Sequence, residues 1–215
     1  LLHEKLDSVS PLVRPRIARE IDERILTPCE ERDDFWWMGF DTSARGGRRV
    51  NNWNPWICSN WLASTLLMEN DESRRQRTVA RIMSCVDKFI DPYPSDGGCD
   101  EGPSYWGRAG ASLFDNLDLL FSASDGQIDV YSEPLVKEIG RFIHRVQIDG
   151  DYYINFADAP ALVYPDAILV YRYGLQIGDA EMVELGRWLA ERQGLSEGRN
   201  LKAEREADTK KRGVP

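Results

Sequence analysis

The sequence predicts a mostly α-helical protein that is assembled from antiparallel helical hairpins and contains one short β segment. Apolar residues recur at three- and four-residue spacing in stretches of about 13 to 20 residues. Ser, Asp or Pro opens most of these stretches, and Pro or Gly follows them, so the connections are short. One stretch alone alternates as a strand does. Such hairpins form either a bundle or an incomplete α/α toroid, and periodicity does not choose between the two.

Each expected helix has its own apolar stripe and boundary signals. Ser10 and Pro11 open the first helix, and Asp71 caps the third. Gly178 makes a tight turn between the last two helices, and Gly150 precedes the one expected strand. The expected helices cover residues 10–28, 55–68, 71–90, 113–125, 132–146, 165–177 and 179–193, and the strand covers residues 151–156.

The composition limits the classes of function. Of the 215 residues, 29% are charged and 42% hydrophobic, which allows a sizeable core. A formal charge of −9 argues against a nucleic-acid-binding surface over the whole molecule. No apolar run approaches the ~20 residues of a membrane span, and no signal-peptide profile is visible. We expect an α/α-toroid domain or a fragment of one over residues 1–193, and a polar tail or linker over residues 194–215.

The cysteines predict no metal site. Cys29, Cys58, Cys85 and Cys99 include no pair at the C-x-x-C spacing of structural zinc sites. Cys58 and Cys85 stand among apolar neighbours, where a free cysteine behaves as a small hydrophobic residue. We therefore expect four buried or inert thiols, with a disulfide as the alternative, and no metal or other cofactor in this chain.

Two clusters of amides, carboxylates and aromatic rings stand out from the rest of the chain. They are residues 51–56 (NNWNPW) and residues 96–107 (DGGCDEGPSYWG). Each leads into an expected helix, and two such loops can assemble one cleft. The alternatives are structural: Asn51 and Asn52 would be helix caps, the indoles would be core, and Tyr105 would be a core residue with a satisfied hydroxyl.

The residues of both clusters resemble the heparinase II/III-like polysaccharide lyases, over roughly residues 30 to 180. Asn51 stands 54 residues before Tyr105, as the pattern of that family leads us to expect. The resemblance implies an N-terminal α/α toroid joined to C-terminal antiparallel β-sheets, so a downstream β-sheet domain is an expected partner. It implies β-elimination of a uronic-acid-containing polysaccharide such as heparin or heparan sulfate. It also implies a periplasmic or secreted location.

The resemblance assigns roles to individual residues. Asn51 matches the position that neutralises the uronate carboxylate, and Tyr105 matches the tyrosine that protonates the leaving glycosidic oxygen and also takes the C5 proton in some members. Asn54 departs from the pattern, because some members carry a Glu there. The family uses a His base that finds no counterpart: His144 reads as a half-buried helix residue, and His3 is the only other histidine. That base is expected in the downstream domain.

The remaining candidate residues are expected to bind the glycan. Amides and carboxylates hydrogen-bond sugar hydroxyls, indoles form platforms for sugar rings, and arginines attract a polyanion to an otherwise acidic protein. A nearby cation also makes a phenol a more efficient base. The expected substrate-binding residues are Asn52, Trp53, Asn54, Trp56, Glu101, Trp106, Arg45, Arg48, Arg49 and Arg108.

Two other classes of function remain open. A glycoside hydrolase or unsaturated-uronyl hydrolase on the same toroid needs two carboxylates that face each other across the sugar. Its candidates are Asp96, Asp100, Glu101 and Asp158, of which three share one loop. The other alternative is an inactive carbohydrate-binding or structural helical fragment, for which the basic loop at residues 44–49 would be a solvated turn.

Overall fold

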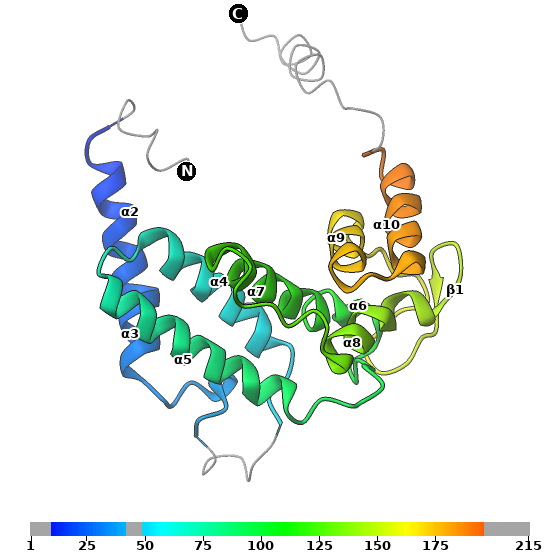
Figure 1. The fold of residues 1–215 in the computed structure, drawn as a ribbon, viewed down its shortest axis with the longest axis horizontal. Coiled ribbons are helices and arrows are strands. Elements are labelled where there is room, and N and C mark those ends of the chain that lie inside the picture. The colour runs from blue at the N-terminus through cyan, green and yellow to red at the C-terminus, as the bar shows by residue number, and fades with distance from the viewer. Residues whose placement is uncertain (1–9, 42–48, 196–215) are drawn as a thin grey trace, which may run out of the picture.

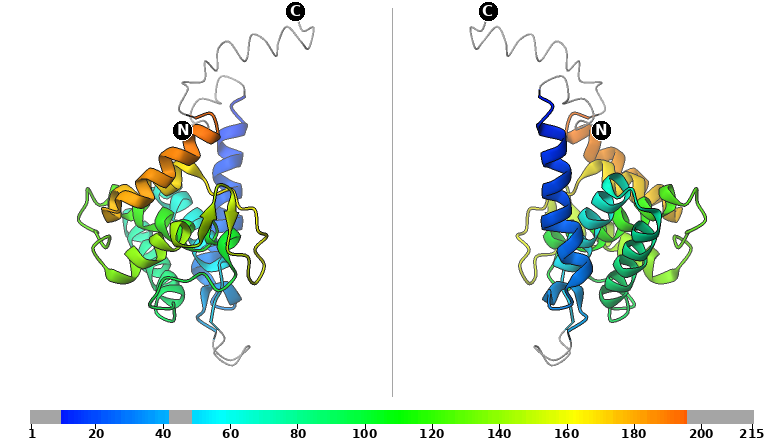
Figure 2. Two further views of the ribbon diagram at one scale, coloured as in Figure 1. Left: turned by 90° about the vertical axis from the view of Figure 1, so that its right-hand side faces the viewer. Right: turned by 90° about the vertical axis from the view of Figure 1, so that its left-hand side faces the viewer.

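The computed structural model describes residues 10–41 and 49–195. It is mostly helical, with 62% helix and 3% strand, which confirms the predicted class. Figure 1 shows the helices following one another along an arc, with α2 (Val13–Ile21) at one end of the long axis and α10 (Ala180–Arg192) at the other. Figure 2 shows these two helices rising on the same side of the molecule. The expected tail lies outside the described residues except at its first two positions.

The first helical segment continues past the point where the sequence predicted its end. After α2 a π-helical turn, Asp22–Leu26, leads into α3 (Thr27–Glu31). Pro28 therefore stands in the first turn of α3, where a missing amide hydrogen costs nothing, and it does not end the helix. The short 3-10 helix Trp36–Met38 then brings Trp37 and Met38 into the core.

The centre of the molecule is formed by α4 (Trp53–Met68), α5 (Glu72–Ile90) and α7 (Gly110–Ala123). Helix α4 packs against both of the others, so little of it faces water. Asp71 caps α5 as predicted, because its Oδ1 accepts a hydrogen bond from the Arg74 amide at 2.6 Å. Between α5 and α7 the chain forms the one-turn helix α6 (Pro103–Trp106), which contacts α8 (Pro134–Arg145).

The expected strand is shorter than predicted and belongs to a hairpin. Strands β1 (Gln147–Asp149) and β2 (Tyr152–Tyr153) pair antiparallel, with an irregular register between Gln147 and Asp149. Strand β2 ends at Tyr153, although the Ile154 amide still donates to the Val146 carbonyl at 2.9 Å. Strand β1 was missed because three residues are too few to show alternation.

The last two helices, α9 (Ala167–Ile177) and α10, form the tight hairpin that the sequence predicted. Asp166 and Asp179 cap their N-termini, and Gly178 takes the left-handed conformation (φ 68°) that ends α9. The backbones approach closely because Gly174 lacks a side chain: a Cβ there would lie 2.9 Å from the Val183 nitrogen. This hairpin packs against α8.

The four cysteines are free and buried, as predicted. His144 lies on α8, partly buried, with Nε2 at 3.7 Å from Asp179 and Nδ1 at 3.6 Å from Glu181. Burial lowers the pKa of this imidazole, against the attraction of the two carboxylates. In the described part of the chain, no helix is both long enough and apolar enough to cross a membrane.

Candidate functional site

Two glycines fix the loop of the second cluster against the body of the protein. Gly97 and Gly102 have φ values of 75° and 91°, which side chains other than that of glycine rarely tolerate. A Cβ on Gly102 would lie 2.5 Å from the Phe156 carbonyl oxygen and 2.7 Å from the Cβ of Ala159. The segment around residue 156 therefore closes over the start of α6 only because residue 102 is glycine.

We expect Gly102→Ala to lower the free energy of unfolding by ~2–4 kcal/mol, because it adds backbone strain to a steric clash. Urea unfolding followed by circular dichroism measures this loss. Gly107→Ala is the matched control, since the nearest atom to its Cβ would be the Ser104 carbonyl oxygen at 4.0 Å. Equal stability of the two variants would show that the close approach at Gly102 is relaxed in solution.

Glu101 joins the two clusters. Its Oε2 accepts a hydrogen bond from the Asn52 side-chain amide at 2.7 Å, and its Oε1 accepts a longer one from the Asn52 backbone amide at 3.4 Å. Asn52 is buried, whereas Glu101 is partly exposed. These two bonds span 49 residues of sequence and bring residue 51 and the start of α6 into one region.

The carboxyl of Glu101 has a raised pKa, chiefly because burial disfavours its charged form, although the Asn52 backbone amide opposes this. A folded-state pKa above the unfolded one means that the folded protein holds more protons between the two values. The contribution of this carboxyl to the free energy of unfolding therefore falls as pH rises through that interval.

Glu101→Gln removes this titration. We expect the free energy of unfolding of the parent, minus that of the variant, to fall as pH rises from about 4 to neutrality. Urea unfolding at a series of pH values measures the difference. Glu31→Gln at the exposed end of α3 serves as the control. A difference that is constant or rises with pH would contradict the burial of Glu101.

Asn51 lies at the start of α4, partly exposed. Its Oδ1 accepts a hydrogen bond from the Trp53 amide at 3.2 Å, so its oxygen caps the helix. No described residue accepts a hydrogen bond from its side-chain nitrogen. The rings of Trp36 and the adjacent Trp53 are half-exposed, and their centroids lie 5.4 Å apart. Asn51 can thus cap α4 with its oxygen while its amide nitrogen remains able to donate to a ligand.

The adjacent aromatic residues of α6 point to opposite environments. Tyr105 is 37% exposed, whereas Trp106 is 1% exposed and donates its indole N–H to the Ile139 carbonyl at 2.8 Å. The Trp106 ring also stacks on Tyr173. Trp106 therefore anchors the short helix in the core, and this anchoring holds Tyr105 at the surface.

Asn54 does not occupy the position that the sequence assigned to it. Its side chain is fully buried, and its Nδ2 donates to the backbone carbonyls of Trp37 at 2.8 Å and Cys85 at 2.9 Å. It joins α4 to α5 and to the 3-10 helix, so as placed it cannot reach a glycan outside the core. Buried Asn116 acts similarly, since its Nδ2 donates to Pro55 and Ser112 carbonyls.

The arginines that the sequence suggested as glycan-binding residues differ in their contacts. Arg49 pairs with Asp100 at 3.3 Å and lies over the Tyr93 ring, so part of its charge is already balanced. Arg108 follows α6 and lies over the Trp56 ring, 4.6 Å from its centroid. This contact is a second link between the clusters, one helical turn beyond Asn52. Arg45 and Arg48 lie outside the described residues.

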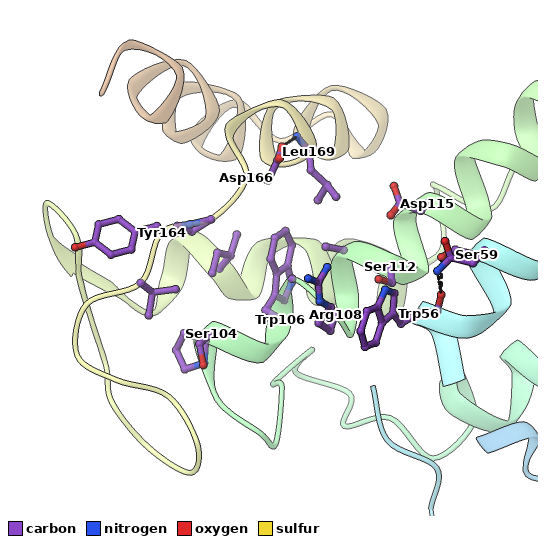
Figure 3. A pocket seen from close by; sticks show the side chains of 17 residues that line it. Trp56, Ser59, Ser104, Trp106, Arg108, Ser112, Asp115, Tyr164, Asp166 and Leu169 are labelled. Carbon is purple, nitrogen blue, oxygen red and sulfur yellow. Dashed lines mark hydrogen bonds between the residues drawn. The ribbon is translucent and has the colours of Figure 1, made fainter. Parts of the chain in front are cut away.

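A cavity of about 460 Å³ opens beside α6, between α4, α7 and the segment that leads into α9 (Figure 3). Of the sequence-predicted residues, Trp56, Trp106 and Arg108 line it. The other described candidates do not line it: Asn51, Asn52, Trp53, Asn54, Glu101, Tyr105 and Arg49. Ser104 and Trp106, the sequence neighbours of Tyr105, do line it, so the cavity lies beside the one-turn helix that carries Tyr105.

Sequence analysis missed the polar groups inside this cavity. They are Ser59, Asn60 and Ser104, with Ser112, Asp115, Tyr164 and Asp166. Ser112 and Asp115 sit one turn apart in a helix that is otherwise rich in buried apolar residues, and this interruption was the available signal. Burial raises the pKa of the Asp115 carboxyl, and the nearby Arg172 guanidinium opposes that rise.

The carboxylates that the sequence suggested for a hydrolase do not line this cavity. Asp96 accepts a hydrogen bond from the Gly98 amide at 2.9 Å, Asp100 pairs with Arg49, and the Asp158 amide donates to the Glu101 carbonyl at 3.3 Å. None of these three lines the cavity, and neither does Glu101 or His144. His3 lies outside the described residues.

Residues 10–41 and 49–195 contain no group of three His, Cys, Asp or Glu side chains that could hold a metal ion. A scan of the chain against models of known protein families gives no match, and a search among curated proteins gives none either. The resemblance to polysaccharide lyases therefore rests on the residues of the two clusters.

Proposed function

We propose that this chain is the helical part of a polysaccharide lyase that cleaves a uronic-acid-containing glycan of the heparin or heparan sulfate type by β-elimination. In this proposal the arc of hairpins is part of an incomplete α/α toroid. A downstream β-sheet domain completes the enzyme and supplies the His base, and the protein acts in the periplasm or outside the cell.

The observation that carries the proposal is the bridge between Asn52 and Glu101. Together with the Arg108–Trp56 contact, it sets residues 51–56 alongside residues 101–108. Asn51 and Tyr105 both lie within this paired region, and both are partly exposed. In the proposal, this amide donor and this phenol act on one bound sugar.

Each group has a defined task in the elimination. The amide nitrogen of Asn51 donates to the uronate carboxylate, which stabilises the negative charge that develops when the C5 proton is removed. The His base of the downstream domain takes the C5 proton, the C5–H electron pair forms the C4–C5 double bond, the C4–O bond breaks, and the phenol of Tyr105 gives its proton to the leaving oxygen. Arg49 and Arg108 add positive potential beside this site, which favours binding of a polyanion.

A hydrolase on the same helical scaffold is the second candidate. Asp115 and Asp166 both line the cavity, and two carboxylates across a sugar are what glycoside hydrolysis requires. Asp166, however, already caps α9, since its Oδ1 accepts a hydrogen bond from the Leu169 amide at 2.8 Å. The lyase is preferred because Asn51 and Tyr105 belong to the two clusters that the Asn52–Glu101 bridge joins.

Ultraviolet absorbance distinguishes the candidates, because only elimination creates a C4–C5 double bond conjugated with the carboxylate. The panel is heparan sulfate, chondroitin sulfate, hyaluronan and alginate, assayed with this chain and with the chain joined to the downstream β-sheet domain. The lyase predicts rising absorbance with at least one glycan in the joined form. New reducing ends without absorbance would establish the hydrolase, and binding without any cleavage would establish the inactive fragment.

A further inference from the structure

The cavity beside α6 contains a buried hydroxyl that the protein itself does not use. Ser112 is 3% exposed and lines the cavity, yet its hydroxyl makes no hydrogen bond within the described part of the chain. Figure 3 shows it among the cavity side chains, near Trp56. A serine hydroxyl can both donate and accept, so this one is available to a ligand that enters the cavity.

Two carboxylates reach the same cavity from different elements. Asp115 lies one turn after Ser112 on α7, and Asp166 lies at the start of α9. Asp166 uses one oxygen for its helix cap, and a carboxylate can accept further donors. The opposing charges are Arg108 over the Trp56 ring and Arg172, which pairs with Asp118 and also attracts the Asp115 carboxylate. Negative groups thus face the cavity on two sides, and one of the two nearby guanidiniums is already paired.

The remaining walls suit a sugar ring. Trp56 and Tyr164 are both partly exposed at the cavity, and Figure 3 places them apart along it. Aromatic rings with exposed faces pack against the apolar face of a pyranose, while hydroxyl and carboxylate groups bind its edge. The volume of about 460 Å³ lies within the ~300–1,000 Å³ of typical small-molecule sites.

We infer that this cavity is a subsite for the sugar unit next to the uronate, and that Ser112, Asp115 and Asp166 select a unit with hydroxyl or ammonium donors over a sulfated one. The inference rests on the proposed function, because it places the same glycan chain across both regions. Ser104 and Trp106, which flank Tyr105 in sequence, line the cavity, so the cavity and the phenol share the one-turn helix α6. A sulfate there meets the like charge of Asp115 and Asp166, and among the described residues that line the cavity Arg108 alone carries an opposing charge.

The test measures binding and needs no turnover. Two oligosaccharides of the same uronate–hexosamine backbone, one with and one without sulfate on the hexosamine, are titrated calorimetrically into the full chain carrying Tyr105→Phe. The preference ratio is the affinity for the unsulfated form divided by that for the sulfated form. Asp115→Asn and Asp166→Asn remove one charge each, and Asn at residue 166 keeps the helix cap.

We expect each Asn variant to lower the preference ratio by about tenfold or more, because like charges across an interface cost several kcal/mol. Asp125→Asn, an equal change of charge at an exposed left-handed residue after α7, should leave the ratio unchanged. A ratio unaffected by both cavity variants, with thermal unfolding like the parent, overturns the subsite. Ultraviolet absorbance reports separately on the lyase, so a chain with selective binding and no elimination loses the proposed activity alone.

Discussion

Tyr105→Phe is expected to lower the turnover number of the proposed lyase by ~10²–10⁴-fold while glycan binding is retained. The substitution keeps the ring and removes only the hydroxyl proton that the leaving oxygen requires. Because the side chain is 37% exposed and its hydroxyl makes no hydrogen bond within the described residues, folding should change little. Steady-state rates from product absorbance and affinities from calorimetry measure the two effects.

Two further variants help to interpret the result for Tyr105→Phe. Tyr152→Phe removes a hydroxyl from another exposed tyrosine, on the hairpin, and should leave the rate unchanged. Asn51→Ala should lower both rate and affinity, because it removes the donor to the uronate carboxylate. If Tyr105→Phe turns over within a few-fold of the parent, Tyr105 is structural and the mechanism loses its general acid.

Asn54→Ala is expected to lower the free energy of unfolding by ~2–4 kcal/mol. The variant deprives the Trp37 and Cys85 carbonyls of a donor and leaves a void in a fully buried position. Urea unfolding measures the loss. Asn60→Ala on the exposed face of the same helix should change stability by no more than about 0.5 kcal/mol.

Equal stability of Asn54→Ala and Asn60→Ala would contradict the structural role of Asn54. A loss of glycan affinity in Asn54→Ala, with stability intact, would instead return this residue to the binding role that the sequence suggested.

The helices were predictable because their signals are local. Asp71, Asp179 and Gly178 cap or end helices where the sequence placed them, since capping depends on neighbouring backbone groups. Pro28 misled the boundary prediction because a π-helical turn moved it into a first-turn position. The end of β2 depends on its pairing with β1, which alternation within a single segment does not encode.

The sequence identified candidate residues by their chemistry, but it did not show which of them the fold leaves at the surface. Tyr105 and Asn51 are partly exposed, as their assigned roles require. Asn54 carries the same amide group as Asn51. It lies three residues further along the chain, within α4, and the helix directs its side chain into the core. Asp115 and Asp166 are far apart in sequence and meet only through the packing of α7 and α9, so no pattern along the chain could join them.

The most direct measurement is the mass of the products formed from one defined uronate oligosaccharide by the chain joined to the downstream β-sheet domain that the proposal expects. Elimination adds nothing to the substrate, so the masses of the two products should sum to that of the parent oligosaccharide, and the product with the new double bond should absorb in the ultraviolet. A sum larger by one water, without absorbance, would contradict the lyase and identify a hydrolase.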